Sequence, residues 1–276
     1  MAEVCIIVVN YGNPERTIRF VKEECPKIGI SYKVVVADNG PNDASKALKE
    51  GLEGFATVIP TGGNVGFAKA NIAGAQAAGP ADYLLFVNND IVFTDSDVVD
   101  KLIKVLEKHP NAGLIGPKIL GLDGKDQSPE PFQSFAQRHI LPYWGKFSKN
   151  RHKWDNREYS AKAGAGWHYR IMGSFLLMRA DDYKACGGFD PETFLYSEES
   201  ILSERLKAIG KRVWYEPSVK VLHEHAATTE RYFDKVRVRR MKLESDIYYY
   251  RKYREVTTAE IALARFTLWL KERLGR

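Results

Sequence analysis

The sequence contains little cysteine. Three cysteines, Cys5, Cys25 and Cys186, occur among 276 residues, and their spacings follow no pattern. An odd number at unrelated spacings argues against a disulfide framework and against a zinc site built from cysteine. This usage fits a reducing compartment, so we expect a cytoplasmic protein.

Long apolar runs and targeting signals are lacking as well. No run approaches the ~20 apolar residues that a transmembrane helix requires. The chain enters the apolar run CIIVV after a few residues, without the basic start and cleavage site of a signal peptide. Repeats and low-complexity segments are also absent. The length and composition predict one large α/β domain, alone or with a helical appendage.

The common nucleotide-binding and hydrolase signatures are missing. The loop GGNVGF at 62–67 lacks the Lys-Ser/Thr pair of a P-loop and the spacing of a dinucleotide-binding fingerprint. No G-x-S-x-G elbow and no H-E-x-x-H run occurs. These absences disfavour P-loop nucleotide hydrolysis, hydride transfer and the common hydrolase chemistries.

Positive charge is concentrated at one end of the chain. Residues 231–276 contain 13 Lys or Arg and 6 Asp or Glu, out of totals of 41 and 35, so the rest of the chain is almost neutral. A basic tail of this kind could meet anionic lipid, a phosphate-bearing acceptor or nucleic acid. The alternative is a solvated helical face without a partner.

The first 120 residues alternate β-branched apolar runs with segments of helical period, which predicts a parallel sheet covered by helices. Expected strands cover 4–10, 32–37, 56–60, 83–87, 169–179, 212–215 and 219–223. Expected helices cover 14–24, 43–51, 67–78, 95–109, a segment from about 180, 197–209 and 258–274. The pattern breaks down over 121–167, which we interpret as an excursion that shapes a site or binds a partner.

Polar residues follow four of the expected strands. Ligands of open α/β sheets bind outside the carboxyl ends of the strands, so these positions predict a binding site. Each group alone also fits a simple turn, because Asn, Asp and Gly favour turns. The four groups are Asn10 with Tyr11, Asp38 with Asn39, the loop 61–67, and the run from Asn88 to Asp90.

The motif VNND at 87–90 predicts a metal site. Its carboxylate and carboxamides are hard oxygen ligands of the kind that Mg²⁺ and Mn²⁺ accept, and such a cation can bridge a diphosphate. The alternative is that Asp90 caps the following segment. Because one carboxylate holds such a cation weakly, we expect a second ligand, and His223 at the end of VKVLH is the candidate.

Two adjacent carboxylates, Glu198 and Glu199, open an expected helix in FLYSEESILSERL. Their charge would complement the helix dipole, which needs no function. Alternatively, they could supply a general base, since desolvation raises a carboxyl pKa toward neutral pH.

The ordered series of motifs resembles family 2 glycosyltransferases, in particular their bacterial rhamnosyltransferase-like branch. The series comprises IIVVNYGNPE, VVVADNG, TGGNVGFAKANIAGAQAAG, YLLFVNND, HPNAGLIGPKIL, GSFLLMRADDYKACGGFDPETFLYSEE and VKVLHEHAATT, and it runs from about residue 4 to 229 without the excursion. The resemblance implies a GT-A fold, that is, a Rossmann-like, mostly parallel sheet with flanking helices, continuous with a smaller acceptor-side sheet. It places the catalytic domain at 1–230, with the nucleotide-sugar part at about 1–120 and the acceptor side at 121–230, followed by a basic helical tail at 231–276.

The resemblance also implies roles for individual residues. Asn10, Tyr11, Asp38, Asn39, Asn64, Gly66, Phe67, Asn88 and Asn89 would bind the nucleotide-sugar, Asp90 and His223 the metal, and Glu198 with Glu199 would form the acidic pair. Two positions depart from the family pattern. Two residues after Glu199 the chain has Ile201, where the family has a further Asp, and Asn88 replaces an Asp. The second departure leaves Asp90 as the only carboxylate of its motif.

We therefore expect an inverting transfer with Mn²⁺ or Mg²⁺, in which Glu199, or else Glu198, takes the proton of the acceptor hydroxyl. Arg205 or Lys252 would assist with phosphate charge. The donor would be dTDP-rhamnose or a UDP-sugar, and the acceptor a saccharide or a lipid-diphosphate-linked saccharide, with no nucleic acid as partner. A non-catalytic sugar-nucleotide-binding relative and a nucleotidyltransferase remain as alternatives.

The end of the tail predicts a second property. In TAEIALARFTLWLKERLGR, apolar residues recur around much of the expected helix while Arg265, Lys271, Arg273 and Arg276 supply positive charge. Helices of this composition lie in a membrane interface. Packing on the catalytic domain or in a homodimer is the alternative.

Overall fold

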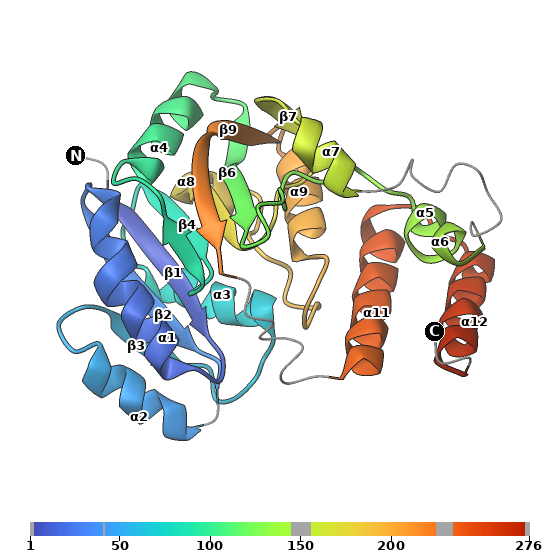
Figure 1. Cartoon of the computed structure of the whole chain (residues 1–276), viewed down its shortest axis with the longest axis horizontal. Coiled ribbons are helices and arrows are strands. Elements are labelled where there is room, and N and C mark those ends of the chain that lie inside the picture. Colours follow the sequence, from blue (N-terminus) through green and yellow to red (C-terminus); the bar gives the residue numbers. More distant parts are fainter. Residues whose placement is uncertain (1–2, 41, 145–155, 225–233, 274–276) are drawn as a thin grey trace.

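The computed structural model describes residues 3–40, 42–144, 156–224 and 234–273. Within them, nine strands form a single sheet in the order β3-β2-β1-β4-β8-β6-β9-β5, and β7 pairs with β9 (Figure 1). The parallel half consists of β1 (Val4–Asn10), β2 (Tyr32–Asp38), β3 (Thr57–Pro60) and β4 (Tyr83–Val87). All four were expected from their apolar, β-branched runs.

The other half of the sheet mixes strand directions. It comprises β5 (Ile91–Phe93), β6 (Ala112–Gly121), β7 (Gly166–His168), β8 (Phe175–Arg179) and β9 (Arg212–His223). β8 runs antiparallel to both β4 and β6, and β9 runs parallel to β6 and antiparallel to β5. The strands of this half thus continue the sheet that the parallel strands begin, as the fold expectation had it.

The strand expectations were wrong in several details. β5, β6 and β7 were not expected. β6 was missed because it contains three glycines and a proline, which are depleted in strands. At one of these, Gly116, the packing is close, since a Cβ there would lie 2.5 Å from Ile171 Cδ1 and 3.2 Å from the carbonyl oxygen of Phe175. The segment 169–179 is a strand only from Phe175, and 212–223 is one strand, whose register on β6 shifts after Glu216.

Helices cover both faces of the sheet. On one face lie α1 (Pro14–Arg19) with its π and 3₁₀ continuation to Ile28, α2 (Asn42–Gly51) and α4 (Val98–Lys108). On the other lie α3 (Phe67–Ala77), α8 (Ala180–Ala185) and α9 (Glu198–Ala208). Alternate residues of β1 enter the two resulting cores, Ile6 the first and Ile7 the second, as the two-residue period of a strand requires.

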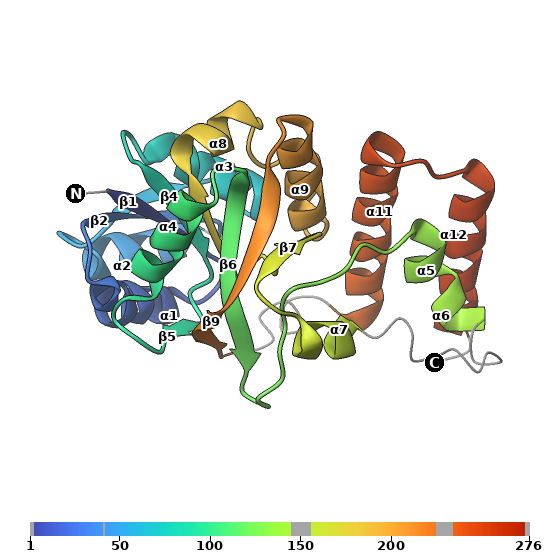
Figure 2. The same cartoon turned by 90° about the horizontal axis from the view of Figure 1, so that it is seen from above.

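The basic tail is helical and packs on the excursion. α11 (Lys235–Tyr253) contacts α9, and α12 (Thr258–Arg273) contacts α11 and α5 (Phe135–His139), which α6 (Leu141–Trp144) follows (Figure 2). A further helix of the excursion, α7 (Asn156–Lys162), precedes β7. α5, α9, α11 and α12 share a third core that includes Phe135, Ile201, Leu243 and Ile261. In the part of the chain that the structure describes, no helix is both long and apolar enough to cross a membrane.

Candidate functional site

A chain of buried side-chain hydrogen bonds joins the ends of three parallel strands. Asn89 Nδ2 donates to Thr17 Oγ1 at 2.7 Å, and Thr17 Oγ1 donates to Asn10 Oδ1 at 2.7 Å. Asn10 Nδ2 then donates to Asp38 Oδ1 at 3.0 Å, and Ser45 donates to the other oxygen of Asp38. The polar groups after β1, β2 and β4 therefore form one connected network, which independent turns would not require.

Asn39 organises the glycine-rich loop after β3. Its Oδ1 accepts from Val65 N–H at 2.8 Å and from Thr61 Oγ1 at 3.1 Å, and its Nδ2 donates to Asn64 Oδ1 at 3.1 Å. Both ends of the amide are thus used to shape the backbone of the loop. The four strand ends that were singled out in the sequence meet at one edge of the sheet.

The glycine-rich loop also contacts the segment that leads to the acidic pair. Phe67 N–H donates to the carbonyl oxygen of Phe194 at 2.8 Å. Gly66 has φ +91°, and a Cβ there would lie 2.3 Å from the same oxygen, so only glycine fits. The glycine-rich loop is in this way tied to the segment that precedes Glu198 and Glu199.

Asp90 and His223 lie side by side because β5 pairs with β9. Ile91 is opposite His223 in the register of these strands, and Asp90 Oδ1 lies 3.1 Å from His223 Nε2. Both residues are buried, at 7% and 3% exposure. The sequence expectation that they form one site therefore agrees with their placement, although 133 positions separate them.

The chemistry of this pair fits a divalent cation. His223 Nδ1 lies 2.7 Å from Gln127 Oε1, so it carries the proton, and the lone pair of a neutral ring is then on Nε2, toward Asp90. Asp90 Oδ1 accepts no hydrogen bond from the described residues. Two acceptors that face each other at this distance are unfavourable unless a cation or proton lies between them. Among the described residues, no cluster of three or more His, Cys, Asp or Glu side chains is arranged to hold a metal ion.

Arg16 is a further charged neighbour of this pair. Its Nη1 lies 3.8 Å from Asp90 Oδ2, and its Nη2 lies 3.8 Å from Glu224 Oε2. Arg16 stands on the first turn of α1, whose N-cap is Asn13. The sequence analysis passed over Arg16, although its place in NPER, directly after the first strand end, was a usable signal.

Glu199 is held beside the metal motif by a tight turn. Gly173 N–H donates to Glu199 Oε1 at 3.0 Å, and the next residue, Ser174, accepts from Asn88 N–H at 3.0 Å through its carbonyl oxygen. A Cβ on Gly173 would lie 2.5 Å from Glu199 Oε1, so this approach needs glycine. Arg170 Nη1 lies 3.5 Å from Glu199 Oε2. The side chain of Glu199 is partly exposed. The backbone of Gly173 orients its carboxylate, and the neighbouring Ser174 contacts Asn88.

Glu198 has a different environment. Its side chain is 3% exposed, and its Oε1 has no hydrogen-bond partner among the described residues. Burial, and next the negative charge of Glu199, raise the pKa of Glu198 to about 8. Near neutral pH Glu198 therefore holds a proton and is a poor base.

The backbone before the acidic pair is strained and held from the tail. Tyr196 and Ser197 adopt φ values of 78° and 69°, which side chains other than glycine rarely adopt. Asp246 on α11 accepts from Ser197 Oγ at 2.5 Å, and Ser245 donates to the carbonyl oxygen of Leu195 at 2.8 Å. Asp246 is fully buried, which by itself would raise its pKa. The positive charge of Arg138 and the hydrogen bond with His139 instead hold the pKa of Asp246 below its usual range.

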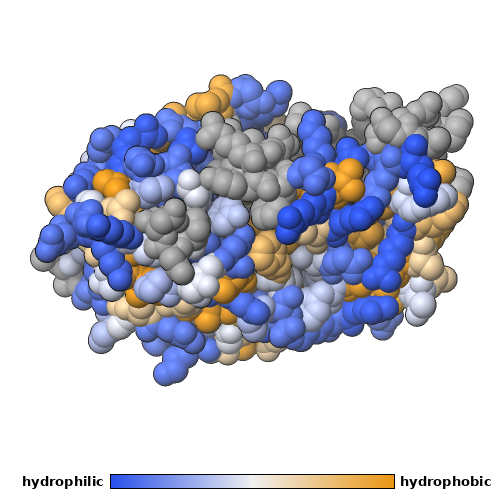
Figure 3. All heavy atoms as spheres, turned by 90° about the horizontal axis from the view of Figure 1, so that it is seen from below, coloured by the Kyte–Doolittle hydropathy of each residue, from blue (hydrophilic) through white to orange (hydrophobic). Residues whose placement is uncertain are grey.

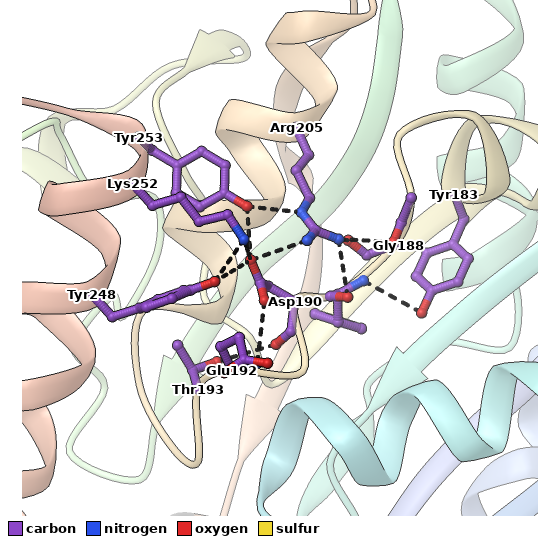
Figure 4. Close-up of polar contacts among 11 residues, drawn as sticks. Tyr183, Gly188, Asp190, Glu192, Thr193, Arg205, Tyr248, Lys252 and Tyr253 are labelled. Atoms are coloured by element: carbon purple, nitrogen blue, oxygen red, sulfur yellow. Dashed lines mark hydrogen bonds and ion pairs between the residues drawn. The ribbon is translucent and has the colours of Figure 1, made fainter.

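Arg205 lies in another cluster (Figure 4). It donates to the carbonyl oxygens of residues 187–189 and to Tyr253 Oη at 3.0 Å, and its Nη2 lies 3.0 Å from Asp190 Oδ2. Lys252 and Tyr248 on α11 donate to the same Asp190 oxygen at 2.9 and 3.0 Å. Arg205 and Lys252 thus join the tail to the loop before α9, and their expected contact with phosphate finds no support in this arrangement.

The structure accordingly brings most of the expected site residues together. Asn10, Asp38, Asn39, Asn64, Gly66, Phe67, Asn88, Asn89, Asp90, Glu199 and His223 belong to the connected strand-end network or contact its loops, and Tyr11 follows β1 directly. Residues that the sequence analysis missed are Thr17, Gly173, Ser174, Arg170 and Asp246. The run GSF was visible in the sequence, but no local pattern indicates Asp246.

Comparisons with known proteins agree with this arrangement. Over 241 residues the chain is 28% identical to the N-acetylglucosaminyl-diphospho-decaprenol L-rhamnosyltransferase of Mycobacterium tuberculosis. The matched region covers 82% of this chain and 77% of that protein. It is also 28% identical over 242 residues to the rhamnosyltransferase WbbL of Escherichia coli, which covers 84% of this chain and 87% of WbbL.

Solved structures show the same fold at low sequence identity. The mannosyltransferase PcManGT of Pyrobaculum calidifontis, solved with GDP-Man and Mn²⁺, superposes with a TM-score of 0.60 and 13% identity over 99% of this chain and 76% of that protein. TarS 1–349 of S. aureus, solved with UDP, gives a TM-score of 0.57 and 14% identity over 99% of this chain and 72% of TarS. The model of the family described as glycosyl transferase family 2 matches residues 4–182, so this chain is a glycosyltransferase that belongs to that family.

Proposed function

We propose that the protein transfers a sugar, with inversion, from a nucleotide-sugar donor to a saccharide acceptor. The single observation that carries this proposal is the connection between Asp90 and Glu199 through Asn88, Ser174 and Gly173. It sets a cation site for a diphosphate beside a carboxylate that can act as a base, which is the pair of groups that a direct displacement at an anomeric carbon needs. dTDP-rhamnose is the donor we expect first, because of the rhamnosyltransferase relatives, and UDP-sugars come second.

Asp90 and His223 would hold a divalent cation, Mn²⁺ or Mg²⁺, which when bound supplies Lewis-acid stabilisation of the departing nucleoside diphosphate. Mn²⁺ in the related fold of PcManGT supports this assignment. The strand-end residues around Asp38 and Asn39 would bind the nucleoside part of the donor. Glu199 would accept the proton of the attacking acceptor hydroxyl. Because Glu198 is neutral, it would add no second negative charge near the donor diphosphate.

The acceptor we propose is a saccharide on a lipid diphosphate. The name of the mycobacterial relative states such an acceptor, N-acetylglucosaminyl-diphospho-decaprenol. A protein that acts on this kind of acceptor works at the surface of a membrane, and we place it at the cytoplasmic face.

Product analysis tests the proposed reaction. Incubation with dTDP-rhamnose or UDP-sugars, Mn²⁺ and a lipid-diphosphate acceptor is expected to release free nucleoside diphosphate in step with acceptor glycosylation. Release of pyrophosphate would instead identify a nucleotidyltransferase. Donor binding without any turnover would identify a non-catalytic sugar-nucleotide-binding protein.

The exposed face of α12 supports membrane contact. Ile261, Ala264 and Leu268 turn inward to the third core, whereas Phe266 and Trp269 remain 51% and 49% exposed. Leu263 and Leu270 are exposed on the same face, at helical spacing, and Figure 3 shows apolar surface beside strongly hydrophilic surface at this end of the molecule. Because the tail carries a large positive excess, an anionic lipid surface attracts this face, while a second copy would bring like charges together.

Vesicle flotation tests this contact. The protein is expected to float with vesicles of phosphatidylcholine and phosphatidylglycerol, and less with phosphatidylcholine alone or at high salt. The double change Phe266→Ser and Trp269→Ser should abolish flotation, whereas Phe55→Ser, at an equally exposed aromatic elsewhere, should not. Equal flotation of the double variant and the Phe55 variant would contradict membrane contact. A wild type that does not float, but forms a dimer that the double variant loses, would contradict it as well.

A further inference from the structure

A tight hairpin at the start of the excursion carries Gln127 to the candidate metal site. β6 ends at Gly121, whose Cα partner on β9 is His223. The chain then turns back, because Gly121 N–H donates to the carbonyl oxygen of Lys125 at 3.0 Å and Gln127 N–H donates to that of Ile119 at 2.9 Å. Gln127 thereby returns alongside the end of β6, and its Oε1 lies 2.7 Å from His223 Nδ1.

Gly121 leaves the space for this contact. A Cβ at position 121 would lie 2.7 Å from Gln127 Nε2, so the amide packs directly over a residue without a side chain. The neighbouring Asp126 holds the returning segment to β6, since its Oδ2 lies 3.0 Å from Lys118 Nζ. The hairpin therefore keeps the side chain of Gln127 against both the backbone of Gly121 and the ring of His223.

The contact with Gln127 decides what His223 offers to Asp90. A neutral imidazole carries hydrogen on one ring nitrogen and a lone pair on the other. Because Gln127 Oε1 accepts, the hydrogen belongs on Nδ1, and Nε2, 3.1 Å from Asp90 Oδ1, presents its lone pair. In the opposite tautomer, Nε2–H would point toward the carboxylate and take the place of a cation. Gln127 thus selects the form of His223 that can accept a metal ion.

We propose that Gln127 is a positioning residue of the metal site, which fixes both the tautomer and the orientation of the His223 ring. The inference rests on the proposed function for the presence of the cation, whereas the proton on Nδ1 depends on residues of this chain alone. It gives the first turn of the excursion a role, namely to supply the hydrogen-bond acceptor behind a metal ligand. Such outer partners commonly change metal affinity by about tenfold to a hundredfold.

Mn²⁺ affinity tests the proposal, measured by electron paramagnetic resonance in the presence of dTDP or UDP. Gln127→Met keeps the length of the side chain but removes the acceptor, and is expected to raise the Kd for Mn²⁺ about tenfold to a hundredfold. Gln127→Glu keeps an acceptor in the same place and should bind Mn²⁺ at least as tightly as wild type. Asp126→Asn, which breaks the ion pair of the same hairpin, should stay close to wild type. Equal affinities of Gln127→Met and wild type, or equal weakening by Met and Glu, would overturn the proposal.

A measurement without metal separates failure of this inference from failure of the proposed function. Long-range proton–nitrogen NMR spectra of the metal-free protein at neutral pH are expected to show hydrogen on His223 Nδ1 in wild type and in Gln127→Glu. In Gln127→Met the hydrogen should lie on Nε2 alone, because Asp90 is then the remaining acceptor. Nδ1 without hydrogen in the wild type, or the same pattern in all three proteins, would overturn the role of Gln127.

The two measurements together identify which claim fails. A wild type with hydrogen on Nδ1 that binds no Mn²⁺ with either nucleotide would count against the metal of the proposed function and not against the tautomer set by Gln127. His223→Ala assigns the ring signals, because they disappear in that variant. Unchanged thermal unfolding of Gln127→Met would exclude misfolding as the cause of a weaker affinity.

Discussion

Glu199→Gln is expected to lower kcat by roughly 10²- to 10⁴-fold, the usual contribution of a general base, while the donor binds as before. The amide keeps the size of the side chain and can still accept from Gly173 N–H, so the turn beside Asn88 survives. It cannot take the proton of the acceptor hydroxyl. Steady-state kinetics with separate determination of kcat and the donor KM checks this result.

Glu198→Gln is the matched control, because an amide resembles the protonated carboxyl that burial enforces at this position. We expect its activity near neutral pH to stay within a few-fold of wild type. Loss of activity in Glu198→Gln with retention in Glu199→Gln would reverse the two roles.

The same control changes how stability depends on pH. Because the pKa of Glu198 is about 8 in the folded protein and near the ordinary value of 4.5 when unfolded, the folded state binds more protons between these pH values. The free energy of unfolding therefore falls as pH rises through this window, and glutamine removes that fall. Chemical denaturation should find Glu198→Gln more stable than wild type by up to about 4 kcal/mol at pH 8, and little different near pH 4.

Asp90→Ala is expected to have the second large effect, a loss of metal-dependent activity on the order of 10³-fold, since Lewis-acid stabilisation contributes several kcal/mol. Asp90 is the only carboxylate of its motif, and its Oδ1 faces His223 Nε2 at 3.1 Å. Removal leaves His223 as the sole protein ligand of the pair. Activity as a function of Mn²⁺ concentration measures the loss.

Asn88→Ala is the comparison for Asp90→Ala. The hydrogen bonds that the structure gives Asn88 are made by its backbone. Its N–H donates to the carbonyl oxygen of Ser174, its carbonyl oxygen accepts from Ile91 N–H, and alanine keeps both. We therefore expect a weakened enzyme with ordinary dependence on Mn²⁺. Comparable losses from both substitutions would mean that the metal site is shared between the two positions.

The sequence predicted those features of the fold and the site that depend on residues adjacent along the chain. β1 and β2 are runs of β-branched and large apolar residues that end in Asn10 and Asp38, and β4 ends in Val87 directly before Asn88. Both the strands and the polar residues at their ends could therefore be predicted from neighbouring residues. The sequence also suggested Asp90 and His223 as neighbours, since a metal needs a second ligand and VKVLH ends in a histidine, and the two side chains lie 3.1 Å apart. By contrast, the glycines of β6 hid a strand, since the close packing at Gly116 involves distant residues.

The remaining features of the site depend on contacts between distant parts of the chain. The turn at Gly173 that links Glu199 to Asn88 becomes visible only when β8 lies beside β4. Arg205 looked like a phosphate ligand because it is basic and near Glu199 in sequence, yet Asp190 and three carbonyl groups occupy it. Asp246 gave no signal, because its role depends on α11 packing against the segment before α9.

Thermal unfolding with nucleotide-sugars tests the central claim most directly, namely that this glycosyltransferase binds its donor through a cation at Asp90. We expect one of dTDP-rhamnose and the UDP-sugars to stabilise the wild type only when Mn²⁺ is present, by about 2.7 kcal/mol at a hundredfold excess over Kd. Asp90→Ala should show no such stabilisation. Equal stabilisation of wild type and Asp90→Ala, or no shift of the wild type with any donor, would contradict the claim.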